Sequence, residues 1–228
     1  MKEFNTFEEK VNVSFADKGL LQLAFTHRSY VNENRQFTEH NERLEFLGDA
    51  VLELVVTEYL FDKFPDKAEG ELTAVRAALV NTKSISKAAQ DLGMNDYLLL
   101  SKGENKDTGR ARQYILANTF EAFIGALHLD QGYVAAQKFI ATSLFSKVDD
   151  IVEHKLWQDA KSKLQEEAQE HMSITPDYKS VSERGPDHNK VFTISVMFDD
   201  VEVAQGSGKS KQEAEQEAAQ KALEVKGW

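Results

Sequence analysis

The chain has 228 residues, 41% of them hydrophobic, with no cysteine and a formal net charge of −11 at pH 7. The lack of cysteine excludes disulfides, thiolate zinc sites and a cysteine nucleophile, and the acidic balance argues against a nucleic-acid partner, because phosphate contacts come from lysine and arginine. No apolar run reaches the roughly 18 residues of a membrane span, and the polar start, Met1 to Phe4, lacks a secretory signal. We therefore expect a cytoplasmic protein with no membrane partner and no small-molecule cofactor.

The first two thirds of the chain are predicted to be helical. Breaks are expected at Pro65, at Gly93 and in the polar stretch 101–109. Between them, apolar residues recur at helical spacing in five segments, namely 20–24, 44–64, 72–92, 115–129 and 133–148. We expect an all-α domain over 1–150, followed by a linker over 151–158.

The remainder of the chain changes character. Asp199-Asp200 is expected to form a hairpin turn. The pattern predicts, in order, a helix, three strands and a helix over 159–171, 178–182, 191–198, 201–205 and 210–226. This order suits a small α+β domain over 159–228, with the arrangement α-β-β-β-α and both helices on one face of the sheet.

Neither part of the chain is basic. Residues 1–157 contain 18 basic and 24 acidic side chains, and residues 158–228 contain 9 and 14. Any contact with RNA must therefore come from local arrangement, and its electrostatic attraction should be weaker than that of a basic protein.

One helical segment carries a row of carboxylates. At about 100° per residue, the acidic side chains lie in one arc and apolar ones lie opposite, the acids being Glu42, Glu45, Asp49 and Glu53 and the apolar residues Leu44, Leu47, Val51, Leu54 and Val55. Acids at this spacing usually form only a solvated face. Spacing alone does not make this row a site.

A second helical segment, 114–127, is apolar nearly all the way round, which predicts a central, buried helix. Glu121 and Asn118 are almost its only polar side chains that can project in one direction. A buried carboxylate is costly unless a cation, a metal or strong donors accompany it. Pairing of Glu121 with Arg76 or Arg112 is therefore one interpretation, and a metal site is the other.

If the polar arcs of the two helices face each other, Glu45, Asp49, Asn118 and Glu121 form a cluster of three carboxylates and an amide oxygen. Oxygen ligands without cysteine or histidine favour Mg²⁺, with Mn²⁺ as a substitute, over zinc. Sites of this kind hydrolyse phosphodiesters by activating a water molecule and stabilising charge on the phosphate.

Several motifs give the sequence a resemblance to bacterial ribonuclease III. The run Asn41-Glu42-Arg43-Leu44-Glu45-Phe46-Leu47-Gly48-Asp49-Ala50-Val51 matches the family signature throughout. Supporting matches lie at 26–30, at 69–73 with Arg76, at 102–104 leading to 109–110, and at 115–122. The resemblance covers essentially the whole chain.

The resemblance implies roles for the matched positions. Residues Glu45, Asn118 and Glu121 correspond to metal ligands, and Asp49 and Glu121 to the residues most directly needed for hydrolysis. Acidic positions with a secondary role near the cut correspond to Glu42 and Glu69, and Phe46 corresponds to an aromatic that inserts into the partner of a homodimer. The implied activity is cleavage of double-stranded RNA to 5′-phosphate and 3′-hydroxyl ends, in the processing of rRNA and mRNA precursors.

One position departs from the family pattern. Members usually carry aspartate where this chain has Asn118, so the site has one negative group fewer. Three accounts follow: an active natural variant, an attenuated enzyme or an engineered inactive form. We expect the first, because the other three carboxylates are intact, and the alternative function is a double-stranded-RNA-binding protein with an attenuated nuclease site. A purely structural helical adaptor would leave Glu121 unexplained.

The C-terminal part resembles a double-stranded-RNA-binding domain, through a loop at 183–188 and a helix entry at 206–215. The helix N-terminus there favours phosphate, and Lys209 and Lys211 add positive charge. Gln165 and Gln169, at i and i+4, suit ribose hydroxyls in a minor groove, as does His188. Taken singly, such residues are more often part of a solvated surface; together they predict RNA binding, weakened by Gln212 where lysine is common.

Overall fold

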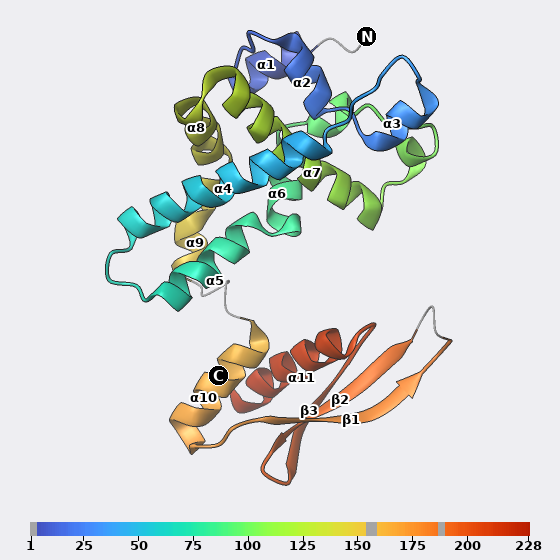
Figure 1. Ribbon diagram of the computed structural model, residues 1–228. Coiled ribbons are helices and arrows are strands. Elements are labelled where there is room, and N and C mark those ends of the chain that lie inside the picture. Colours follow the sequence, from blue (N-terminus) through green and yellow to red (C-terminus); the bar gives the residue numbers. More distant parts are fainter. Residues whose placement is uncertain (1–3, 154–158, 187–189) are drawn as a thin grey trace. The chain divides into compact units, whose positions relative to one another are not determined.

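The computed structural model describes residues 4–153, 159–186 and 190–228. The chain forms two compact units, 1–157 and 158–228, which are coloured blue to yellow and orange to red in Figure 1. The expected linker of 151–158 begins inside a helix, α9, which continues to Glu153.

The first unit is helical, as predicted. In the described range 4–153 its α-helices are α1 (Asn5–Val11), α2 (Lys18–Ala24), α3 (Arg28–Glu33), α4 (Glu42–Lys63), α5 (Glu69–Val80), α6 (Thr82–Asp91), α7 (Arg110–Gln131), α8 (Tyr133–Leu144) and α9 (Val148–Glu153). Short 3-10 turns at Met94–Tyr97, Glu104–Lys106 and Phe145–Lys147 complete it.

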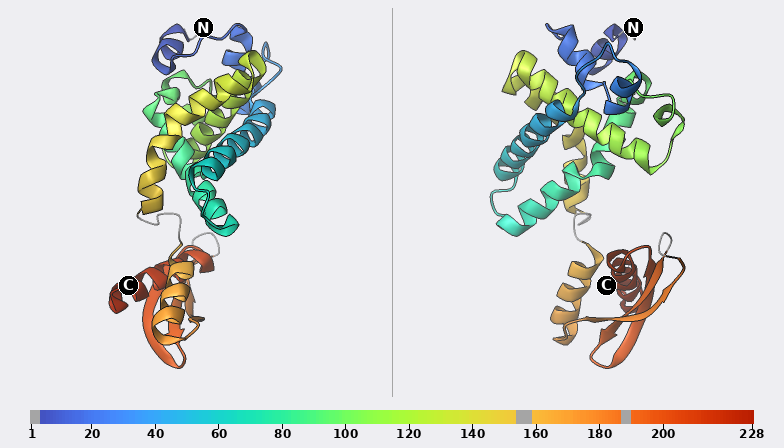
Figure 2. Two further views of the ribbon diagram at one scale, coloured as in Figure 1. Left: turned by 90° about the vertical axis from the view of Figure 1, so that its left-hand side faces the viewer. Right: turned by 45° about the vertical axis from the view of Figure 1, so that its right-hand side comes forward.

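Helix α7 is the centre of this unit. Its residues from Ile115 to Leu127 are almost all buried, and they join the side chains of the surrounding helices in one apolar core. The prediction of a central, buried helix is therefore confirmed. Figure 2 shows α4 crossing α7, and the two helices pack directly against each other.

Two glycines set the distance between α4 and α7. A Cβ atom added at Gly48 would lie 1.7 Å from the carbonyl oxygen of Glu121, and one added at Gly125 would lie 2.2 Å from that of Leu44. Both distances are far shorter than any real contact, so the helix backbones touch with no side chain between them. This crossing places the residues that flank Gly48 beside those that flank Glu121.

The first unit also differs from its prediction. The segment predicted as one helix over 72–92 is divided at Asn81, whose extended backbone (ψ 157°) ends α5 and whose side chain accepts from Ser84 N–H to begin α6. Helices α1 and α3 were not predicted. Leu54, which helical spacing places with Leu44 opposite the acidic side chains, is 51% exposed, whereas Leu44 is buried.

The second unit has the predicted order of helix, three strands and helix. Its elements are α10 (Ala160–Met172), β1 (Asp177–Arg184), β2 (Val191–Phe198), β3 (Val201–Gly208) and α11 (Lys211–Lys226). The strands form an antiparallel sheet in the order β1-β2-β3, and Asp199, with a positive φ of 53°, lies in the predicted turn.

The core of the second unit confirms that both helices cover one face of the sheet. Side chains of α10 and α11 meet those of β2 in one apolar cluster: Leu164, Ala168, Val196, Phe198, Ala218, Ala219, Ala222 and Leu223. Alanine predominates on α11, so this helix can lie close to the sheet.

Across the described ranges of both units, none of the helices combines the length and the hydrophobicity that crossing a membrane requires.

Replacing Gly48 with alanine should force α4 and α7 apart. We expect Gly48→Ala to lower the free energy of unfolding by about 3 kcal/mol or more, because the added methyl group would overlap backbone rather than a movable side chain. Gly70→Ala on α5 is the matched control, since no atom lies within 4 Å of its added Cβ, and it should be neutral or stabilising by up to about 1 kcal/mol. Urea unfolding measures both; equal effects would contradict the crossing.

Candidate functional site

Four polar side chains meet where α4 crosses α7. Glu45 and Asp49 come from α4, and Asn118 and Glu121 from α7. Asp49 is exposed and the other three are half-buried. The amide of Asn118 is placed to act as a hydrogen-bond donor to the carboxylate of Glu45 across the helix crossing. The predicted convergence of the two polar arcs is therefore present.

The carboxylates of this cluster repel one another. Burial raises the pKa of Glu121 to about 8, and the negative charges of Asp49, Glu45 and Glu53 add to the effect. Burial also raises the pKa of Glu45, helped by the charges of Glu42 and Asp49 and opposed by the hydrogen bond from Asn118. Partly buried carboxylates with raised pKa values are typical of sites that bind cations or protons.

The interpretation that an arginine neutralises Glu121 is wrong. Arg76 forms an ion pair with Glu53, with 2.8 Å between Nε and Oε2, and donates to the Thr57 hydroxyl. Arg112 donates to the carbonyl oxygens of two loop residues and to Asn95 Oδ1. Within the described ranges no basic side chain forms an ion pair with Glu121.

The donor set of the cluster consists of oxygen atoms alone, which suits a hard divalent cation. As the side chains stand, no group of three or more histidine or acidic side chains in residues 4–153, 159–186 and 190–228 is gathered to hold a metal ion. A bound cation would offset the burial and the neighbouring negative charges that raise the pKa of Glu121.

The two secondary acidic residues lie in different places. Glu42 is on the same face of α4 as Glu45 and forms an ion pair with Arg28, 3.5 Å between Nη1 and Oε1. Glu69 begins α5, accepts a hydrogen bond from Thr73 and lines a groove of about 450 Å³ that Phe61 also lines. The chain brings Glu42 to the cluster but leaves Glu69 at this separate groove.

Helix α4 exposes an apolar strip. Phe46 is 82% exposed, Leu54 51% and Phe61 70%. Their spacing of eight and seven residues keeps all three within about a quarter turn of the helix. Burying such side chains against another surface would be favourable, and sequence reasoning identified only Phe46, because Leu54 matches the core periodicity equally well.

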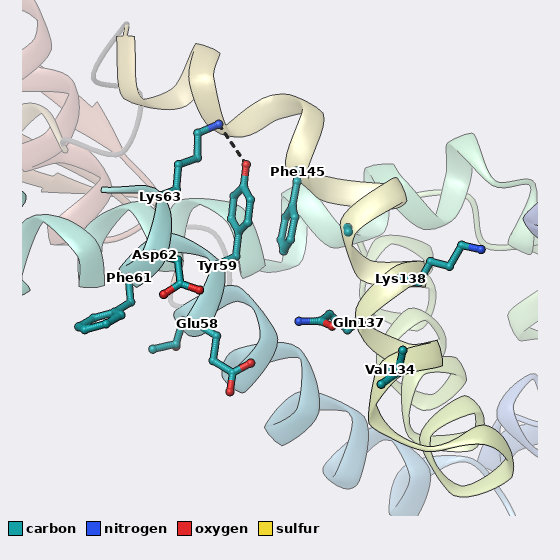
Figure 3. A pocket seen from close by; sticks show the side chains of 11 residues that line it. Glu58, Tyr59, Phe61, Asp62, Lys63, Val134, Gln137, Lys138 and Phe145 are labelled. Atoms are coloured by element: carbon teal, nitrogen blue, oxygen red, sulfur yellow. Dashed lines mark hydrogen bonds between the residues drawn. The ribbon is translucent and has the colours of Figure 1, made fainter. Parts of the chain in front are cut away.

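A larger cavity, of about 920 Å³, lies between α4 and α8 and is separate from the carboxylate cluster. Figure 3 shows the rings of Tyr59 and Phe145 face to face, with centroids 3.7 Å apart, and Lys63 donating to the Tyr59 hydroxyl. The acidic side chains at its rim, Glu58 and Asp62, are not those of the cluster. No residue predicted to be functional lines this cavity.

The predicted RNA-binding residues of the second unit are accessible. Gln165 and Gln169 are exposed on α10, and Lys209 and Lys211 are exposed at the start of α11. Ser210 caps α11 by accepting from Glu213 N–H at 3.1 Å. His188 lies outside the described residues.

Comparison with known families agrees with this division. A model described as ribonuclease-III-like matches residues 17–148, and a double-stranded RNA binding motif matches residues 160–226. The chain is 49% identical to ribonuclease 3 of Geobacillus thermodenitrificans over 225 residues, which is 98% of this chain and 91% of the relative. The chain belongs to the ribonuclease III family. It is an endoribonuclease of this type.

Further relatives extend the comparison. Ribonuclease 3 of Bacillus cereus strain G9842 is 48% identical over 222 residues, 96% of this chain and 90% of the relative. A solved nuclease domain of ribonuclease III from Campylobacter jejuni, described for flexibility in a region involved in dimer formation, has a TM-score of 0.56 and 43% identity. It covers 62% of this chain and 98% of that one, so the likeness lies in the helical unit.

Burial and the neighbouring carboxylates disfavour the ionised form of Glu121, so Glu121→Gln is predicted to stabilise the metal-free protein. The pKa of Glu121 rises from 4.5 to about 8 on folding, so its ionisation opposes folding above pH 4.5, and the penalty grows until about pH 8. Allowing for solvent screening, we expect a gain on the order of 1–2 kcal/mol at pH 8, or a midpoint higher by roughly 2–8 °C.

Thermal unfolding in EDTA measures this gain, which should shrink as the pH falls toward 4.5. Glu9→Gln, at an exposed position on α1, is the control for removing one negative charge. A Glu121→Gln protein no more stable than the Glu9→Gln protein at pH 8 would show that folding does not disfavour the ionised form of Glu121.

Proposed function

We propose that the chain is a Mg²⁺-dependent endoribonuclease that cleaves double-stranded RNA to 5′-phosphate and 3′-hydroxyl ends in the cytoplasm, and that its substrates are rRNA and mRNA precursors. The observation that carries this proposal is the convergence of Glu45, Asp49 and Glu121 from two helices, where none of the basic side chains that the structure describes forms an ion pair with them. Mn²⁺ is the expected substitute for Mg²⁺.

In this proposal Glu45, Asn118 and Glu121 hold the metal ion. When bound, the ion supplies an activated water molecule and stabilises charge on the phosphate. Asp49 is the exposed member of the cluster, so it can orient the attacking water and accept its proton at the side chain oxygen. Glu42 and Glu69 have secondary roles near the cut.

Asn118 is what favours the second candidate function, a double-stranded-RNA-binding protein with an attenuated nuclease. An amide oxygen can bind Mg²⁺ but adds no charge. The same amide, as a hydrogen-bond donor to Glu45, opposes the rise that burial causes in the pKa of that carboxylate. Because three carboxylates remain, the active enzyme is the function that we propose.

The second unit would bind the duplex. Gln165 and Gln169 on α10, together with His188, are proposed to contact ribose hydroxyls, and Lys209 and Lys211 the phosphates. This mode reads the shape of the duplex more than its sequence. The net charge of −11 implies modest affinity with little help from the rest of the chain.

The exposed strip of Phe46, Leu54 and Phe61 supports a homodimer. We propose that Phe46 inserts into the partner subunit, since an aromatic side chain that is 82% exposed gains most from burial there. Glu69 and Phe61 line the same groove. A dimer formed through α4 and α5 would therefore place the partner subunit next to Glu69.

Cleavage of a long RNA duplex tests the function. The full chain should produce a ladder of products only with Mg²⁺ or Mn²⁺, and Glu121→Ala should abolish cleavage, by about 10³-fold or more, while leaving duplex binding in EDTA nearly unchanged. Product ends are identified by their sensitivity to a 5′-phosphate-dependent exonuclease. Glu9→Ala is the control.

Cleavage by the Glu121→Ala protein would show that the metal centre is placed wrongly. A gel shift without cleavage by the natural sequence would instead support the attenuated protein. Absence of both would contradict RNA as the substrate.

Replacing Phe46 should weaken the dimer. We expect Phe46→Ser to shift the full chain toward the monomer by at least roughly tenfold in dissociation constant, because an aromatic anchor is lost from the interface. Sedimentation velocity over a concentration series measures it. Val134→Ser is the control, since Val134 is 75% exposed on α8; an equal effect of both variants would contradict the proposed interface.

A further inference from the structure

The end of β3 lies directly against the first turns of α11. A Cβ atom added at Gly206 would lie 2.2 Å from the backbone nitrogen of Ala218, and one added at Gly208 would lie 2.5 Å from Cβ of Glu213. Because β3 is an edge strand of the sheet, its outer N–H groups are open to side chains that extend from α11. We call the segment 206–211 the phosphate edge.

Two glutamates of α11 use the donors of the phosphate edge. The carboxylate of Glu213 accepts from the backbone N–H of Lys209 at 2.8 Å, and that of Glu217, one turn further along, accepts from the N–H of Ser207. Glu217 also forms an ion pair with Lys221 at 3.1 Å. A carboxylate here occupies two kinds of group, a backbone N–H and a lysine, that a phosphate would otherwise engage.

The Glu217 carboxylate is ionised at neutral pH and accessible to solvent. The Ser207 N–H and Lys221 lower its pKa below the ordinary value, and the side chain is 43% exposed. It is therefore a negative charge at the surface where the RNA backbone would approach. A third glutamate, Glu215, pairs with Lys161 at 2.5 Å and withdraws another cation.

Glu213 and Glu217 differ in whether they help to begin helix α11. Glu213 is three residues after Ser210, so its reach back to the preceding backbone is a helix-capping arrangement with a structural purpose. Glu217 is one turn beyond Glu213 and about two turns beyond the Ser210 cap, so the helix does not need it to begin. Its bond to Ser207 is thus the feature that capping leaves unexplained.

We propose that Glu217 is an internal substitute for RNA phosphate that lowers the affinity of the phosphate edge for duplex RNA. The proposal rests on the double-stranded-RNA binding of the proposed function and adds to it a residue that sets its strength. Duplex RNA must displace or tolerate this carboxylate, so binding is weaker than the lysines alone would give.

Binding of the full chain to a 5′-fluorescein-labelled 24-base-pair RNA duplex in EDTA tests the proposal, by anisotropy across a series of salt concentrations. Glu217→Gln removes the charge and keeps an oxygen that accepts from Ser207. We expect roughly three- to tenfold tighter binding at low salt and a steeper dependence of log K on log salt, by up to about one unit. Glu224→Gln, an exposed glutamate at the other end of α11, controls for net charge and should change the affinity less than twofold.

Each outcome decides the proposal. Equal affinity of the Glu217→Gln and natural proteins, or an equal gain from Glu224→Gln, overturns it while leaving RNA binding intact. Weaker binding with a lower unfolding midpoint shows a structural role and also overturns it. If the natural chain does not bind but Glu217→Gln does, the inference stands; if neither binds duplex at any salt concentration, RNA binding itself fails.

Discussion

The backbone contact between α4 and α7 is the constraint on which the rest of the nuclease unit depends. Gly48 and Gly125 let two long helices meet with no side chain between them. Because the backbones are this close, the side chains next to the crossing determine which polar groups come together there. Those residues are acidic on α4 and otherwise apolar on α7, so Glu121 enters an environment that already contains negative charge. Burial of the apolar core around α7 offsets the free-energy cost of placing Glu121 there.

The carboxylates at the two proposed functional surfaces differ in whether a basic side chain accompanies them. In the helical unit, Arg76 pairs with Glu53 and Arg112 binds loop carbonyls, which leaves Glu121 to interact with other acids. In the second unit Glu215 and Glu217 each have a lysine partner. An acidic protein can thus present an uncompensated cluster at the proposed metal site and compensated carboxylates elsewhere. Net charge alone, which argued against RNA, does not distinguish these two uses.

Much of the fold could be predicted from the spacing of apolar residues, because each helix or strand must bury one face. The central position of α7 was predictable from its nearly continuous apolar surface, and β2 was predicted with its observed bounds, since a run such as Val191–Phe198 suits few other structures. The break between α5 and α6 at Asn81 was not predicted. Asparagine is nevertheless a common N-cap residue, and here its side chain accepts from the N–H of Ser84, three residues later. The exposure of Leu54 was not predicted, because helical spacing does not distinguish a core face from an exposed apolar strip.

The site was predictable to a lesser extent. The identity of the acidic residues could be read from the sequence, but the failure of Arg76 and Arg112 to reach Glu121 depends on tertiary contacts between distant segments. The same is true of Glu217, whose bond to Ser207 requires β3 to lie against α11. The central claim is that carboxylates from α4 and α7 jointly hold a divalent ion. Anomalous scattering from crystals grown with Mn²⁺ tests it most directly. A peak within about 2.5 Å of oxygens of both Glu45 and Glu121 is the predicted result, and bound manganese that contacts neither helix, or no peak at saturating Mn²⁺, would contradict it.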